Sequence, residues 1–144
     1  MIELIDPIIS SNKVDISTGL NVHYLEASKN NNNHPIALLL HGFPELSFSW
    51  RKIIPILAYE GFRVIAPDMR GYGLTSGGTK KYDTNISEYR LLNLTTDILS
   101  LISALKINKV DLLVGHDAGS SVAGTSALIR PDIFKSVVMM SAPF

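Results

Sequence analysis

The alternation of short apolar runs with helical segments constrains the fold of this chain more than any other feature. Four apolar runs, at residues 35–42, 62–68, 109–115 and 134–144, are bounded by Gly, Pro or polar side chains. Such runs are typical of strands that are buried on both faces of a sheet. Because helical segments separate them, the sequence predicts an α/β fold, with a mostly parallel sheet and helices on both faces.

The segments between the runs have helical periodicity. Pro55 predicts a late or irregular start for the first helix, and Gly61 predicts its end. Asn85 and Glu88 are candidates to cap the second helix, and the third helix is expected over residues 118–130. The apolar stripe of the first helix comprises Trp50, Ile53, Ile54, Leu57 and Ala58, and that of the second comprises Leu94, Ile98, Leu101, Ile102 and Leu105.

Two further strands are predicted near the N-terminus. Residues 13–18 and 20–27 alternate in polarity on either side of Thr18-Gly19, which is typical of an antiparallel pair. The Asn-rich tract at 28–34 and the Gly-rich stretch at 69–84 are predicted to be surface connections.

Composition excludes several classes of function. The 13 basic residues balance the 13 acidic ones, so no electrostatic field favours binding to nucleic acid or to an anionic membrane. The absence of Cys excludes disulfides, thiolate zinc sites and a Cys nucleophile. No run reaches the roughly 18 apolar residues of a membrane span, and the N-terminus lacks the pattern of a secretory signal. We therefore expect a cytoplasmic protein; the sequence does not indicate its oligomeric state.

Two polar motifs follow predicted strands, at the carboxyl ends where open α/β sheets place binding and catalysis. The first is His41-Gly42-Phe43-Pro44, and the second is Gly115-His116-Asp117-Ala118-Gly119. With Ser in place of Asp117, the second motif would be the G-x-S-x-G nucleophile elbow. The two glycines are expected where strand and helix pass close together, and the helix N-terminus favours a negative charge on Asp117.

These motifs carry a resemblance to the α/β-hydrolase superfamily that extends from about Val14 to Phe144. The stretches HGFPE, SWRKIIPILAYEGFRVIAPDMRGYG, VGHDAGS and SAPF occur in the expected order and spacing. An Asp at the elbow with HGFP upstream resembles the epoxide hydrolase branch most. The resemblance implies that residues 1–144 form the N-terminal part of a single α/β-hydrolase domain, ending before the cap domain and the last strands.

The resemblance also implies a reaction. A carboxylate is already ionised at neutral pH, so Asp117 needs no base to act as a nucleophile. It would open a small hydrophobic epoxide and form an alkyl-enzyme ester, which a His-activated water would hydrolyse to a diol. By resemblance, the backbone N–H groups of Phe43 and Ala118 would form the oxyanion hole. No metal or organic cofactor is implied.

Other residues near the motifs are expected to support the site. His41 and His116 are interpreted as structural residues that hydrogen-bond loop backbone, beside the motif residues Gly42, Pro44, Gly115 and Gly119. Asp68 and Arg70 are predicted to form an ion pair or anchor a loop. Trp50 either packs in the core or lines the substrate pocket, and Ser120 is expected to contribute small-residue packing.

Two departures from the family leave alternatives open. Ala118 stands where dehalogenases of the superfamily carry Trp or Arg, which weighs against haloalkane or haloacetate dehalogenation more than against epoxide opening. The resemblance implies that the catalytic His, the orienting acid and the cap tyrosines are absent from this chain, so we expect it to be inactive alone. A dehalogenase or other Asp-nucleophile hydrolase, and a non-catalytic ligand-binding or half-domain relative, remain the alternatives.

Overall fold

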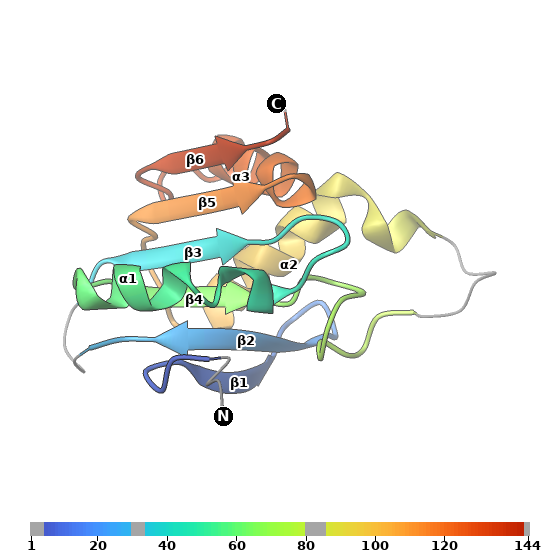
Figure 1. Cartoon of the computed structure of the whole chain (residues 1–144). Helices are drawn as coiled ribbons and strands as arrows, with labels where there is room; N and C mark the ends of the chain where they lie inside the picture. Colours follow the sequence, from blue (N-terminus) through green and yellow to red (C-terminus); the bar gives the residue numbers. More distant parts are fainter. Residues whose placement is uncertain (1–4, 30–33, 80–85, 143–144) are drawn as a thin grey trace.

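The computed structural model describes residues 5–29, 34–79 and 86–142. These residues form a six-stranded sheet in the order β1-β2-β4-β3-β5-β6 (Figure 1). The β1–β2 and β2–β4 pairs are antiparallel, and the remaining pairs are parallel. The strands are β1 (Ser10–Asp15), β2 (Asn21–Ala27), β3 (Ile36–Leu40), β4 (Arg63–Pro67), β5 (Leu112–His116) and β6 (Val137–Met140).

Helices cover both faces of the sheet, as predicted. Figure 1 shows α1 on the near face and α2 and α3 on the far face. Two short 3-10 helices, η1 and η2, precede α1 and α2 along the chain. The bounds are η1 (Ser47–Trp50), α1 (Ile53–Tyr59), η2 (Ile86–Tyr89), α2 (Leu91–Ala104) and α3 (Ala118–Ile129).

Strand β3 is buried on both sides because its side chains alternate between two cores. Leu38 and Leu40 pack in the cluster that includes Ile98 of α2 and Val122 of α3. Ala37 and Leu39 pack in the opposite cluster, with Ile54 and Ala58 of α1. This arrangement explains why the run at 35–42 is continuously apolar rather than alternating in polarity.

The N-terminal pair of strands is confirmed, with shifted bounds. Val14 lies opposite Val22, and the turn between the strands contains Gly19 with a φ of +86°, in the left-handed region that favours glycine. Strand β1 begins and ends three residues earlier than predicted, because the Ile16 N–H already donates to Leu20 O within the turn.

The start of α1 differs in part from the prediction. The helix begins at Ile53, which is 42 % exposed, so its place in the buried stripe was predicted wrongly. Trp50 belongs to the preceding 3-10 turn instead. Pro55 lies in the first turn of the helix, where a missing N–H is tolerated, and Gly61 follows its end with a φ of +99°.

The predicted cap of α2 is wrong for Glu88. Helix α2 begins at Leu91, and Arg90 at its N-cap position makes no capping hydrogen bond through its side chain. The carboxylate of Glu88 instead accepts hydrogen bonds from Thr79 Oγ1 and Arg70. Asn85 lies outside the described residues.

Strand β6 lies at one edge of the sheet. It pairs with β5, and Val137 and Val138 are 37 % and 43 % exposed. On its other side, no strand of the described residues pairs with it. In the same described ranges, no helix has the length and apolar character needed to span a membrane.

Candidate active site

Asp117 lies on a tight turn between β5 and α3. Its φ of +53° and ψ of −120° are costly for a residue other than glycine, and such strain is concentrated at functional sites. Close packing around the turn excludes side chains at the flanking glycines. A Cβ atom at Gly119 would lie 2.6 Å from His41 O, and one at Gly115 would collide with the backbone of Gly119.

The carboxylate of Asp117 is held by two backbone amides. The Phe43 N–H donates to Oδ1 at 2.9 Å, and the Ala118 N–H, next in the chain, lies near enough to favour the ionised carboxylate. These two N–H groups hold the pKa of Asp117 below its ordinary value; desolvation opposes them and the neighbouring His116 adds to them. The group is therefore an anion at neutral pH, and the two N–H groups expected to form an oxyanion hole both favour this charge.

Gly42 allows this approach. A Cβ atom at Gly42 would lie 2.6 Å from Asp117 Cβ and 3.0 Å from Asp117 Oδ1. Any larger residue would push the Phe43 amide away from the carboxylate. Pro44, joined to Phe43 by a cis peptide bond, follows on the same exposed loop.

His41 is buried beneath the loop and contacts its backbone. Its Nδ1 lies 2.9 Å from Gly42 O, and its Nε2 accepts the Met69 N–H at 3.0 Å. Burial lowers the pKa of His41, so the ring is neutral with its proton on Nδ1. The Tyr72 ring packs against the His41 ring in a T-shaped arrangement, with centroids 5.0 Å apart. His41 thereby connects the loop after β3 with the loop after β4.

His116 was predicted to bond backbone, and this is wrong. Its Nδ1 lies 3.0 Å from Glu45 Oε2, because the loop after β3 folds back over the elbow. The same carboxylate oxygen accepts the Gly42 N–H at 3.3 Å. Glu45 therefore joins the two motifs. Sequence reasoning did not assign it a role, although it closes the HGFPE stretch.

Trp50 and Ser120 lie in the interior around the site. Trp50 is 8 % exposed and packs with Leu39 and Ile54 in the core under α1, which favours packing over the substrate-pocket alternative. Ser120 Oγ lies 2.7 Å from both Gly115 O and Met140 O and accepts the Met140 N–H. Ser120 is fully buried, as the expected packing role requires, and its hydroxyl in addition links β5, α3 and β6.

Asp68 and Arg70 anchor the loop after β4, each with its own partners. Asp68 Oδ1 accepts the Ser47 N–H, and Oδ2 accepts the Leu74 N–H and lies 2.7 Å from His23 Nδ1. Burial would raise the pKa of Asp68, but these hydrogen bonds outweigh it and lower the pKa.

Arg70 forms its ion pair with Asp97 of α2, and not with Asp68. Its Nε and Nη2 donate to the buried carboxylate of Asp97 at 2.7 and 2.8 Å. The Thr18 hydroxyl donates to the same carboxylate at 2.6 Å. This cluster connects the first hairpin, the loop after β4 and α2.

The described residues contain no group of three or more His, Cys, Asp or Glu side chains that could hold a metal ion. All four histidines of the chain lie in the described ranges. None of them hydrogen-bonds the Asp117 carboxylate: His23 lies against Asp68, His41 bonds backbone, His116 bonds Glu45, and His34 lies in a cleft at the other end of the sheet.

Comparison with known proteins decides the family. A family model described as alpha/beta hydrolase fold matches residues 35–144. The chain belongs to the α/β-hydrolase superfamily, in its epoxide hydrolase-like branch.

Similar proteins include an epoxide hydrolase of Caballeronia sordidicola, which is 43 % identical over 131 residues, 90 % of this chain and 37 % of that protein. Epoxide hydrolase B of Mycobacterium tuberculosis is 40 % identical over 88 % of this chain and 34 % of its own length. The crystal structure of the epoxide hydrolase VrEH1 from Vigna radiata superposes with a TM-score of 0.83 at 39 % identity, over 95 % of this chain and 41 % of that one. This chain therefore spans about two fifths or less of the length of these relatives.

Proposed function

We propose that this chain provides the nucleophile of an epoxide hydrolase, and that it forms the N-terminal part of a single α/β-hydrolase domain. Asp117 would be the nucleophile, and the Phe43 and Ala118 amides would form the oxyanion hole. The relatives named epoxide hydrolases, in sequence and in structure, support this assignment. The observation that carries it is the ionised carboxylate of Asp117, held by two amides at a strained elbow.

The chemistry follows from that geometry. One carboxylate oxygen of Asp117 attacks a ring carbon of the epoxide, so a C–O ester bond forms while a ring C–O bond breaks. The released alkoxide takes a proton from solvent water, and the product is a hydroxyalkyl ester. Water then gives one proton to a base and adds to the ester carbonyl, whose oxygen becomes an anion beside the Phe43 and Ala118 N–H groups. Collapse of this intermediate restores the carboxylate and releases a diol.

We expect the 144-residue chain alone to stop at the ester. Hydrolysis of the ester needs a base that activates water, and the four histidines have the other contacts described above. The expected result is therefore stoichiometric alkylation of Asp117 without turnover.

Intact-protein mass spectrometry after incubation with styrene oxide tests the proposal. The mass should increase by the full mass of the epoxide, since ring opening loses no atoms, and fragmentation should place the adduct on Asp117. Asp117→Asn should remain unmodified. Asp132→Asn is the matched control, because this exposed carboxylate pairs only with Arg130 and its loss should leave alkylation unchanged.

Three results would contradict the proposal. Equal labelling of several carboxylates would remove the special role of Asp117. Diol formation in catalytic amounts that depends on Asp117 would overturn the expected inactivity. Faster labelling by a haloalkane, with an adduct that lacks the mass of the hydrogen halide, would favour the dehalogenase alternative.

A cytoplasmic location and the absence of nucleic-acid partners remain predictions.

A further inference from the structure

A serine, a histidine and an aspartate lie in a line of contacts on the N-terminal hairpin, away from Asp117. Nε2 of His23 lies 2.8 Å from the Ser11 hydroxyl, and Nδ1 of the same ring lies 2.7 Å from Asp68 Oδ2. Ser11 is on the edge strand β1, with β2, β4 and β3 between it and β5, the strand that leads to Asp117 (Figure 1). These contacts have the order of a nucleophile, its base and the residue that orients the base.

The ionisation of Asp68 decides which nitrogen of His23 carries the proton. Burial alone would raise the pKa of Asp68, but its hydrogen bonds lower it, so the side chain is a carboxylate that can only accept. His23 Nδ1 is therefore the donor of the 2.7 Å hydrogen bond. In the neutral ring, Nε2 then has a free lone pair, and the Ser11 hydroxyl donates to it. This is the tautomer in which a histidine can take the proton of a serine.

The histidine is fixed through its main chain as well as its side chain. The His23 N–H donates to Thr75 Oγ1 at 3.0 Å, and its C=O accepts the Asp68 N–H at 2.9 Å. Asp68 is held in turn by the Ser47 and Leu74 N–H groups, at 2.8 and 2.9 Å. His23 and Asp68 are only 6 % and 2 % exposed. The base and the carboxylate that orients it are therefore preorganised in an environment with little water.

Ser11, in contrast, is exposed, so a reagent can reach its hydroxyl. It lies opposite Leu25 in the β1–β2 ladder, diagonal to His23 and on the same face. Because the His23 N–H points away from β1, and the two kinds of antiparallel pair alternate, the Ser11 N–H points to the outer edge of β1. No strand of the described ranges pairs at that edge. This N–H is available to the negative charge that forms when the hydroxyl attacks.

We propose that Ser11 is an activated nucleophile that takes a small acyl group from an activated ester, with His23 as its general base and Asp68 as a positioning residue. The hydroxyl oxygen bonds the ester carbonyl carbon, its proton passes to His23 Nε2, and the bond to the leaving alcohol breaks. The alcohol leaves with that proton. Water then hydrolyses the acyl-serine, again through His23. This proposal does not depend on Asp117 or on the epoxide chemistry.

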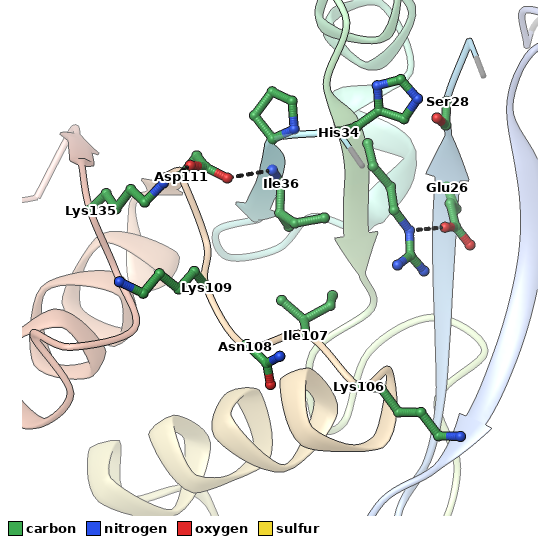
Figure 2. A pocket seen from close by; sticks show the side chains of 12 residues that line it. Glu26, Ser28, His34, Ile36, Lys106, Ile107, Asn108, Lys109, Asp111 and Lys135 are labelled. Carbon is green, nitrogen blue, oxygen red and sulfur yellow. Dashed lines mark hydrogen bonds and ion pairs between the residues drawn. The ribbon is translucent and has the colours of Figure 1, made fainter. Parts of the chain in front are cut away.

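Ser10, the neighbour of Ser11 on β1, provides the matched control. Its hydroxyl is also exposed, but it donates to the main-chain oxygen of Glu26 and contacts no histidine. The carboxylate of Glu26 is committed to Arg63 Nε at 2.6 Å, in the cleft at the starts of β3 and β4 (Figure 2). Ser10 therefore lacks a base, and we expect it to be unreactive.

Diisopropyl fluorophosphate, which labels activated serines, tests the proposal on the 144-residue chain. The Ser11 oxygen should form a bond to phosphorus while the bond to fluorine breaks and fluoride leaves. Intact-protein mass spectrometry should show one diisopropyl phosphoryl group in place of one hydrogen, and fragmentation should place it on Ser11. No adduct under conditions that fully label a serine protease, or equal labelling of several serines, would overturn the proposal.

Variants separate activation from mere exposure. Ser11→Ala should take no label, and Ser10→Ala should be labelled at the parent rate. His23→Asn keeps an N–H donor toward Asp68 but has no group in place of Nε2, so labelling should slow by roughly a hundredfold or more. Circular dichroism checks that each variant is folded. A folded His23→Asn variant that is labelled as fast as the parent would show that the histidine has only a structural role.

Hydrolysis of p-nitrophenyl acetate tests the acyl-transfer step itself. The parent chain should release a stoichiometric burst of p-nitrophenolate, and the burst should be absent from Ser11→Ala and from the chain already labelled with the fluorophosphate. A burst that survives both treatments would assign it to another group and overturn the proposal. Alkylation of Asp117 by styrene oxide reports on the epoxide hydrolase proposal separately.

Discussion

Asp117 combines two properties that rarely occur together: a backbone conformation that disfavours side chains, and a side chain anchored at that point by neighbouring amides. The strain aims the carboxylate at the Phe43 and Ala118 N–H groups. Those N–H groups then stabilise its ionised form. The backbone conformation of Asp117 and the ionisation of its side chain are therefore coupled, and a change in either is expected to alter the other.

The ionisation of Asp117 predicts the pH dependence of alkylation. A carboxyl group whose pKa is depressed stays ionised to lower pH than an ordinary Asp. The rate of epoxide labelling should therefore be constant between about pH 7 and 5, and should fall only below the ordinary Asp pKa of about 3.9. Mass spectrometry of timed samples measures the rate, and circular dichroism at each pH checks the fold. A midpoint above pH 5 would contradict the assignment.

Gly42→Ala should disrupt the hydrogen bond between the Phe43 N–H and the Asp117 carboxylate, because residue 42 lies against Asp117. The new Cβ would lie 2.6 Å from Asp117 Cβ, so the Phe43 amide must move and labelling should slow by roughly tenfold or more. The cost in unfolding free energy should be about 1–3 kcal/mol. Gly78→Ala is the control, since the nearest atom to its added Cβ is 3.6 Å away, and it should leave both measurements nearly unchanged.

At the level of elements, Ser120 secures β6 to the rest of the sheet. Its hydroxyl carries one proton, so it donates to either Gly115 O or Met140 O while accepting the Met140 N–H. A side chain on α3 thus completes hydrogen bonds of two strands. This linkage is important for β6, which pairs with a strand on one side only in the described structure.

Ser120→Ala should therefore destabilise the protein by about 1–3 kcal/mol, because it leaves the Met140 N–H without its acceptor. Ser126→Ala is a matched control in the same helix. Its buried hydroxyl donates only to Val122 O, one turn earlier, and its loss should cost less than about 1 kcal/mol. Urea unfolding measures both, and equal losses would contradict the linking role.

The elements themselves were largely predictable from sequence, because each depends on local pattern. The apolar runs indicate the buried strands of the sheet, and the Gly-x-Asp-x-Gly spacing indicates the elbow before α3. Ile53 and Glu88 were interpreted wrongly, since helix starts depend on neighbouring contacts as well as periodicity. The Glu45–His116 and Arg70–Asp97 pairs could not be predicted, because their members lie 71 and 27 residues apart and only the folded topology joins them.

Across the whole molecule, Asp97 is the point at which distant parts meet. Its carboxylate accepts hydrogen bonds from Thr18, 79 residues away in the first hairpin, and from Arg70 after β4. Both side chains of the ion pair are less than a tenth exposed. A buried carboxylate with three donors contributes to stability only while all of its partners are present.

Asp97→Asn should destabilise the protein by about 3 kcal/mol, since the buried Arg70 guanidinium loses its bidentate anion and keeps only the 3.2 Å contact with Glu88. Asp132→Asn removes an equivalent but exposed pair with Arg130, and should change stability little, because solvent screens this pair. Thermal and urea unfolding give the comparison. Equal, small losses would mean that the buried cluster does not connect these elements energetically.

The two amides that hold Asp117 belong to the main chain, and this has a consequence for how such a site can change over time. A point mutation replaces side chains but leaves the peptide N–H in place, unless it introduces proline. Phe43 is 70 % exposed and Ala118 is exposed as well, so both positions can accept many residues. A combinatorial library at positions 43 and 118 should therefore yield many variants with altered substrate preference and few that lose the reaction outright.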